Sequence, residues 1–232
     1  MCIRDRSLYV VLVGPPSLLI ALAVGRPNLL YRVGLGGVRL GLWLSGIRVE
    51  IRHPENILLD RAAVYAVNHA SNVEPPVLFA ALSGLFPRMR ILYKAELRKL
   101  PILVRAFDLA GFVPLERGNP DQSLPAIERA AHALRDGNSF LIFPEGTRSR
   151  TGDLLPFKKG GFIMALTAQA PIVPVAIKGA RDAMEKGSLI IRPVRVTVSF
   201  GAPIVTAGLT MDQRDALIAR VRSAVARLLG SE

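Results

Sequence analysis

Asn68-His-Ala-Ser-Asn-Val-Glu-Pro-Pro76 is the stretch of sequence from which the fold can be worked out. His69 stands five residues before Glu74, so the two side chains cannot share one face of a helix, on which neighbours are three or four residues apart. The pair must therefore lie on a turn. An imidazole accepts a proton from an alcohol when a nearby carboxylate holds it in the right tautomer. We predict that His69 is a general base and that Glu74 orients it.

The segments on either side of this turn predict a strand and a helix. Residues 62–67 form a short apolar run that is typical of a buried strand, and Pro75 and Pro76 suit the first turn of a helix that continues to Leu82. His69 is therefore expected just past the carboxyl end of a strand, where open α/β sheets bind their ligands.

A second polar cluster has the same context. Residues 136–138 (Asp-Gly-Asn) signal a turn, residues 139–143 (Ser-Phe-Leu-Ile-Phe) predict a buried strand, and the polar run Phe143-Pro-Glu-Gly-Thr-Arg148 follows. We expect the two strand ends to converge on one pocket. Arg148 beside Gly146 and Thr147 offers a planar guanidinium, a hydroxyl and backbone donors, which are the groups that bind a phosphate.

At these positions the chain resembles the glycerolipid acyltransferases, and the 1-acylglycerol-3-phosphate acyltransferase family in particular. Four blocks of that family match in order, and the resemblance runs from Ile47 to Phe200. The blocks are Asn68-His69 with Glu74, Gly111-Phe-Val-Pro-Leu-Glu116-Arg117, the intact Phe143 to Ser149, and Ile172-Val-Pro174-Val175. The family usually has aspartate where this chain has Glu74.

The resemblance implies one acyltransferase domain over residues 48–232, an α/β fold with a mostly parallel mixed sheet flanked by helices. It also implies transfer of a fatty acyl group from an acyl-carrier-protein or coenzyme A thioester to the free hydroxyl of 1-acylglycerol-3-phosphate, which makes phosphatidic acid. No resident cofactor is implied. Two alternatives stay open: an acyltransferase for another lysolipid or lyso-aminolipid, and a non-catalytic basic protein that coats anionic membranes.

Other residues extend the expected site. Lys94 and Arg117, with Lys158, can continue the phosphate-binding surface, and Pro174 is expected to shape an acyl groove. Glu145 has two interpretations: it belongs to the phosphate site, or it ties its loop down by bonding backbone amides. No metal site is expected, because the His and Glu side chains of the two clusters are too few and too mixed in role.

Composition is compatible with this assignment. A chain of 232 residues, 50% of them hydrophobic, can bury the core of one domain. The chain has a net charge of +12 and a pI near 10.8. Its positive charge attracts anionic lipid headgroups, phosphorylated substrates and acidic carrier proteins. We expect no nucleic-acid partner, because the basic residues are scattered, aromatic residues make up only 6%, and no nucleic-acid-binding signature is present.

The amino-terminal region divides into two parts. Residues 1–6 resemble the translated end of a sequencing-library transposon, so we expect them to be a non-native artefact; Cys2, the single cysteine, lies there and excludes an intrachain disulfide. Residues 7–47 are strongly apolar, are interrupted by Gly14-Pro15-Pro16 and carry arginines in their second half. We predict a membrane-associated helical hairpin on the cytoplasmic face of a bacterial inner membrane.

The remaining sequence predicts alternating helices and strands. Helices are expected from Asn119 to Leu134, from Gly160 to Gln169, and from Met211 to Leu229 with Thr210 as its cap. Strands are expected at Ile172–Ile177 and Val194–Phe200, and the second alternates, which places it nearer an edge of the sheet.

Overall fold

The computed structural model describes residues 19, 23–24, 27–99, 101–115, 120–188 and 190–230. The predictions for residues 1–6 and for most of the first apolar run therefore lie outside the described residues, as does the one for Arg117. The second half of the predicted amino-terminal segment is described and forms helix α2 (Pro27–Leu44).

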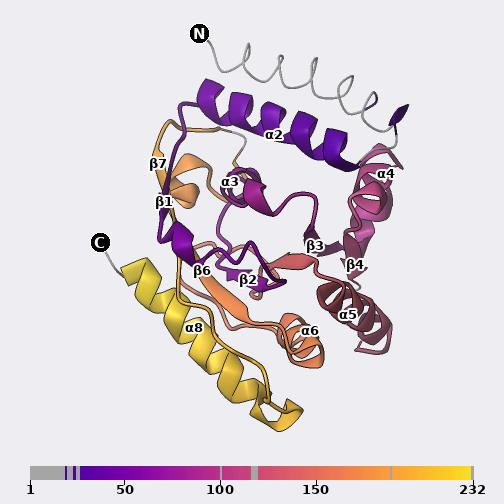
Figure 1. Cartoon of the computed structure of the whole chain (residues 1–232). Helices are drawn as coiled ribbons and strands as arrows, with labels where there is room; N and C mark the ends of the chain where they lie inside the picture. Colours follow the sequence, from indigo (N-terminus) through magenta and orange to yellow (C-terminus); the bar gives the residue numbers. More distant parts are fainter. Residues whose placement is uncertain are drawn as a thin grey trace.

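A seven-stranded sheet of mostly parallel strands forms the centre of the molecule (Figure 1). Its spatial order is β1-β7-β6-β2-β5-β3-β4, and the five strands from β6 to β4 are parallel to one another. β7 runs antiparallel to β6, and β1 pairs in parallel with β7. The strands are β1 (Arg48–Arg52), β2 (Val64–Val67), β3 (Met89–Lys94), β4 (Val113–Leu115), β5 (Ser139–Ile142), β6 (Ile172–Lys178) and β7 (Arg195–Phe200). The predicted α/β class and mixed sheet are confirmed.

Helices cover both faces of the sheet (Figure 1). One apolar core joins the sheet to α5 (Pro120–Arg135), α6 (Gly160–Ala168) and α8 (Arg214–Gly230). The core on the opposite face joins it to α2, α3 (Glu74–Ala81) and α7 (Ala180–Ala183). Because β2 and β5 lie between these two cores, every one of their residues is buried, which explains why all of them except Ser139 are apolar.

The predicted helices after His69 and Asn119, and the one beginning at Gly160, are present within one or two residues of the expected bounds. The last predicted helix starts as a 3-10 turn, Met211–Gln213, before α8 begins at Arg214. The side-chain oxygen of Gln213 accepts a hydrogen bond from the backbone N–H of Thr210 at 3.0 Å, so the capped entry expected at Thr210 exists.

Several elements have no counterpart in the sequence prediction. These are β1, β3, β4, α4 (Pro101–Leu109), α7 and the 3-10 turns Pro54–Asn56, Ser83–Leu85 and Ala95–Lys99. β1 reads Arg-Val-Glu-Ile-Arg and forms the edge of the sheet, where charged residues alternate with apolar ones. β7 is the neighbour of this edge strand, as its own alternating sequence predicted.

The buried aromatic residue Tyr31 adds specific contacts to the apolar packing of helix α2. The ring of Tyr31 stacks on Phe86 with centroids 4.4 Å apart, and its hydroxyl donates a hydrogen bond to the carbonyl oxygen of Met89 at 2.7 Å. These contacts fix α2 over α3 and the start of β3. Within the described residues, no helix combines the length and apolar character needed to cross a membrane.

Candidate active site

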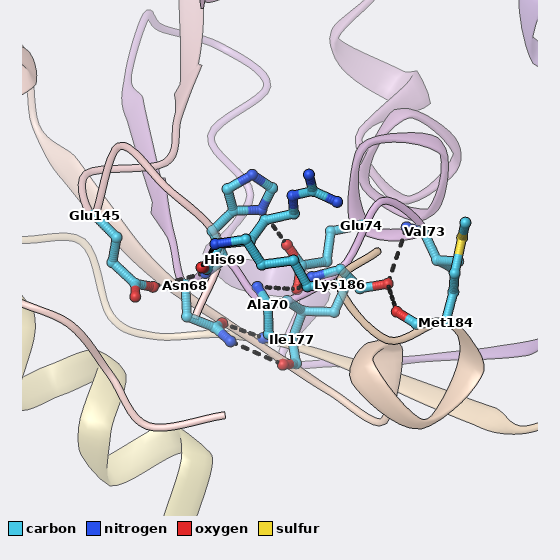
Figure 2. Close-up of polar contacts among 11 residues, drawn as sticks. Asn68, His69, Ala70, Val73, Glu74, Glu145, Ile177, Met184 and Lys186 are labelled. Atoms are coloured by element: carbon cyan, nitrogen blue, oxygen red, sulfur yellow. Dashed lines mark hydrogen bonds and ion pairs between the residues drawn. The ribbon is translucent and has the colours of Figure 1, made fainter. Parts of the chain in front are cut away.

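His69 and Glu74 meet at the carboxyl end of β2 (Figure 2). β2 ends at Val67 and α3 begins at Glu74, so the two side chains flank the connecting loop. The Nδ1 atom of His69 is 2.5 Å from the Oε2 atom of Glu74, and the Glu74 side chain is 0% exposed. The structure thus brings together the pair that the sequence predicted.

Glu74 accepts hydrogen bonds on both carboxylate oxygens. Its Oε1 atom accepts the backbone N–H groups of Ala70 at 2.7 Å and Ser71 at 3.0 Å, while Oε2 faces His69. A carboxylate offers acceptors only, and here its two oxygens face the imidazole and two backbone N–H groups. Because it can only accept, it places the proton of the neutral imidazole on Nδ1 and leaves a lone pair on Nε2. That lone pair is what a general base requires.

The ring of His69 is packed rather than free. It stacks on Phe143, which directly follows β5, with centroids 4.2 Å apart and planes inclined by 28°. The side chain keeps 18% of its surface exposed. The stack and the Glu74 contact fix the ring while one part of it stays open to a substrate.

Asn68 anchors the loop to the neighbouring strand β6. Its Nδ2 atom donates to the carbonyl oxygen of Ile177 at 3.1 Å, and its Oδ1 atom accepts the backbone N–H of the same residue at 2.8 Å. This paired contact continues the β2–β6 ladder by one side chain. His69 therefore starts from a backbone position that two strands determine.

Glu145 ties the two polar loops together. Its Oε1 atom accepts the backbone N–H of His69 at 2.7 Å, and Oε2 accepts the N–H of Leu155 at 3.0 Å. The carbonyl oxygen of His69 in turn accepts the N–H of Ser149 at 2.7 Å. The loop-tying role that we left open for Glu145 is what these contacts describe, while a contact between Glu145 and a phosphate stays a prediction.

The loop from Gly146 to Arg148 carries the groups expected to bind an anion. Gly146 has φ of +67°, and a Cβ atom there would lie 2.9 Å from the side chain of Lys158, which packs against the loop. Thr147 is exposed and Arg148 is half-buried. Within the described residues, the Nη1 atom of Arg148 is buried without a hydrogen-bond partner. A buried guanidinium nitrogen without an acceptor is costly, and an anionic ligand would supply that acceptor.

The other predicted site residues are only partly described. Lys94 is the last residue of β3, and its side chain falls outside what the structure describes. Pro174 is buried in β6, opposite Ala66 of β2. Its expected part in an acyl groove stays a prediction. In the described part of the chain, no group of three or more His, Cys, Asp or Glu side chains is placed to hold a metal ion.

Two further contacts of the site were also not anticipated from the sequence. The hydroxyl of Ser71 donates to the carbonyl oxygen of Met184 at 2.7 Å, and the Nζ atom of Lys186 donates to that of Arg148 at 2.7 Å. Both partners lie more than 35 positions away along the chain, so no local motif signals them.

Fold and site define a single-domain α/β enzyme with a His–carboxylate pair at the end of a parallel strand. A family model described as Acyltransferase matches residues 48–178, which is more than half of the chain. The chain belongs to this acyltransferase family.

Several known proteins are similar over most of the chain. The 1-acyl-sn-glycerol-3-phosphate acyltransferase of Limnanthes douglasii is 33% identical over 221 residues, 92% of this chain and 76% of that protein. The human 1-acyl-sn-glycerol-3-phosphate acyltransferase alpha is 32% identical over 181 residues, 78% of this chain and 63% of that protein. The crystal structure of the 1-acyl-sn-glycerophosphate (LPA) acyltransferase PlsC from Thermotoga maritima has a TM-score of 0.77 at 24% identity. It covers 97% of this chain and 90% of that one, and it shows the same fold.

The first prediction concerns the carboxylate of Glu74. In Glu74→Gln, an amide cannot accept three N–H groups, so the NH2 group faces either His69 or the loop backbone and the imidazole loses its orienting acceptor. We expect kcat for acyl transfer to fall on the order of 10²- to 10⁴-fold, with little change in KM. Glu74→Asp keeps the charge but is shorter by about 1.5 Å. It should therefore lower kcat no more than the glutamine variant. Full activity in Glu74→Ala would contradict this role.

The second prediction uses the pKa of Glu145. Burial raises the pKa of this carboxyl above its usual 4.5, and this outweighs the opposing backbone hydrogen bonds from Leu155 and His69. Folding therefore favours the protonated form, and the contribution of Glu145 to the free energy of unfolding falls as pH rises through the interval above 4.5. Urea denaturation of wild type and Glu145→Gln across this interval should show wild type losing stability relative to the variant.

Glu55 provides the matched control for that experiment. Its pKa is lowered, chiefly by a hydrogen bond to its own backbone, and it lies outside the site. Its contribution to stability is present above 4.5 and is lost as pH falls. The stability difference between wild type and Glu55→Gln should therefore slope in the opposite direction. Parallel slopes for the two variants would rule out the burial effect on Glu145.

Proposed function

We propose that this enzyme transfers a fatty acyl group from a thioester to the free glycerol hydroxyl of 1-acylglycerol-3-phosphate, which yields phosphatidic acid. The proposal rests on one observation: the loop bonded to the His69–Glu74 pair presents a buried Arg148 nitrogen that has no hydrogen-bond partner in the described part of the chain. A base and an anion-binding group on adjacent loops suit an acceptor that has both a hydroxyl and a phosphate. The names of the similar plant and human proteins support the same acceptor.

The reaction follows from the chemistry of the pair. The Nε2 atom of His69 takes the proton of the acceptor hydroxyl as its oxygen attacks the thioester carbonyl. The new C–O bond forms, the C–S bond breaks, and the leaving thiolate receives the proton from the imidazolium. Glu74 stabilises the transient positive charge on the ring. No covalent acyl-enzyme is required.

The acyl donor is proposed to be a thioester of acyl carrier protein or coenzyme A. Both donors are anionic, and the chain has a net charge of +12. A positive field of this size raises the local concentration of anionic partners and speeds their encounter with the enzyme. No resident cofactor or metal enters this scheme.

The third prediction tests the acceptor and the role of Arg148. Purified protein should acylate 1-acylglycerol-3-phosphate in preference to lysolipids that lack a terminal phosphate, when labelled acyl donor is supplied to a panel. Arg148→Ala should raise KM for the phosphate-bearing acceptor on the order of 10- to 100-fold, because a charge-assisted contact is lost. KM for the donor should stay near its wild-type value.

The control for this assay is His69→Ala, which should abolish transfer to every acceptor while leaving the fold intact. An Arg148→Ala enzyme in which only the donor KM rises would assign the loop to the thioester instead. Equal turnover of all lysolipids by wild type would reject the phosphate-bearing acceptor. No transfer to any lysolipid would reject the activity itself.

We also propose that helix α2 attaches the enzyme to the cytoplasmic face of a bacterial inner membrane. Arg32, Arg39 and Trp43 are exposed, Trp43 to 75%, and their spacing of seven and four residues places them on one stripe of the helix. The helix contains no acidic residue. The surface of an anionic leaflet is an interface between apolar and polar surroundings, and exposed tryptophan and arginine side chains suit such an interface.

The fourth prediction concerns this stripe. Replacing Arg32 and Arg39 by glutamine should weaken binding to vesicles that contain anionic lipid by about 5-fold per arginine, because each cation near such a surface contributes about 1 kcal/mol. Flotation of the purified protein with vesicles measures the effect, which should shrink at high salt. Arg220→Gln with Arg227→Gln on the exposed side of α8 is the control of equal charge. Equal losses from the two pairs would indicate general charge attraction instead.

A further inference from the structure

A short segment after β6 contacts both polar loops of the site (Figure 2). It comprises α7 and the residues up to Lys186, and we call residues 180–186 the brace. The carbonyl oxygen of Met184 accepts the hydroxyl of Ser71, which belongs to the His69 loop. The Nζ atom of Lys186 donates to the carbonyl oxygen of Arg148, which belongs to the other loop. The brace therefore has a separate contact with each loop.

The contact with Lys186 acts on a particular peptide group. Its carbonyl oxygen is that of Arg148, and its N–H is that of Ser149, which donates to the carbonyl oxygen of His69 at 2.7 Å. The plane of this peptide is thus held on one edge by an ammonium group and on the other by the backbone of the base. The plane of this peptide also fixes the direction in which the Arg148 side chain projects from the loop.

Lys186 differs from an ordinary surface lysine. It is half-buried, and its ammonium group donates to a backbone carbonyl at 2.7 Å rather than to a carboxylate. Withdrawing an ammonium group from water is costly unless hydrogen bonds compensate for it. A positive charge is also placed beside a residue that is itself a cation and whose Nη1 atom has no partner among the described residues. Two cationic residues joined through a backbone carbonyl add positive charge to this part of the site, which favours an anionic ligand.

We propose that Lys186 is a positioning residue for the phosphate of the acceptor. It acts through Arg148: its bond to the carbonyl oxygen sets the peptide plane, and the plane sets the line along which the guanidinium meets the phosphate. The proposal rests on the function proposed above. None of the four sequence blocks includes Lys186, so the proposal adds a residue to the site from outside these blocks.

The expected kinetic signature is a rise in KM without a matching fall in kcat. The phosphate is remote from the reacting hydroxyl, so its contacts are equally strong in the ground state and the transition state, and losing such a contact changes KM. The His69–Glu74 contact is untouched by a change at Lys186. A general loosening of the site would instead lower kcat.

The fifth prediction is made for Lys186→Met, which keeps the length of the side chain and removes its donor. We expect KM for 1-acylglycerol-3-phosphate to rise about 10-fold, with kcat and the donor KM changed less than about 3-fold. Lys186→Arg retains a cationic donor and should recover most of the loss. Lys178→Met removes an equal charge from an exposed position and should leave all constants unchanged. If Lys186→Met does not fold, Lys186→Gln, a neutral donor, should show an intermediate rise.

A double-mutant cycle with Arg148→Ala separates positioning from direct contact. If Lys186 works through Arg148, Lys186→Met adds no further loss once the guanidinium is absent. Fully additive losses would show that Lys186 contacts the phosphate independently and would overturn the proposal. Ser71→Ala releases the other contact of the brace and should lower kcat instead. Identical changes in kcat and KM for Ser71→Ala and Lys186→Met would show that the brace only supports the site in general, and would also overturn the proposal.

Failure of this proposal is distinguishable from failure of the proposed function. If wild type prefers the phosphate-bearing acceptor and Arg148→Ala loses that preference while Lys186→Met keeps it, only the role of Lys186 is wrong. If wild type shows no preference for the phosphate, the acceptor itself is wrong, and the role of Lys186 falls with it.

Discussion

The buried carboxylate of Glu74 is the group on which the rest of the site depends. It is fully excluded from solvent, and three N–H groups point at it, one from the imidazole and two from the loop backbone. The same bonds shape the loop after β2 and select the tautomer of His69. Loop conformation and the tautomer of the ring therefore cannot be changed independently.

The main-chain groups of His69 fix the position of the loop after β5 relative to the loop after β2. Glu145 accepts the N–H of His69, and Ser149 donates to its carbonyl oxygen, so both main-chain groups of the base are bonded to the loop after β5. Bonds of this kind leave little freedom for the base to move relative to the anion-binding residues. Such fixed geometry contributes to catalysis because a hydroxyl and a thioester carbonyl react only when they are held at near-contact distance.

The parts that were predictable from sequence are those with a local signal. The five-residue spacing of His69 and Glu74 and the apolar runs that became β2, β5 and β6 fixed the edge of the sheet that holds the site. β1, with charges between its apolar residues, and the four-residue helix α7 carry no such signal. The bonds of Glu145 and Lys186 join positions 76 and 38 residues apart, so only the folded chain reveals their partners, although a loop-tying role for Glu145 was one of the two interpretations of the sequence.

The long reach of these anchors also bears on the order in which the protein matures during synthesis. His69 and Glu74 are five positions apart and can meet soon after they leave the ribosome, whereas Asn68 waits for Ile177, 109 positions later, and Ser71 for Met184, 113 positions later. Contacts so distant in sequence close late, because the intervening chain must first be ordered. In a nascent chain that ends before β6, the loop of His69 lacks its anchors to Ile177 and Met184. Acyl transfer therefore depends on contacts that can form only once β6 and the segment up to Met184 have been made.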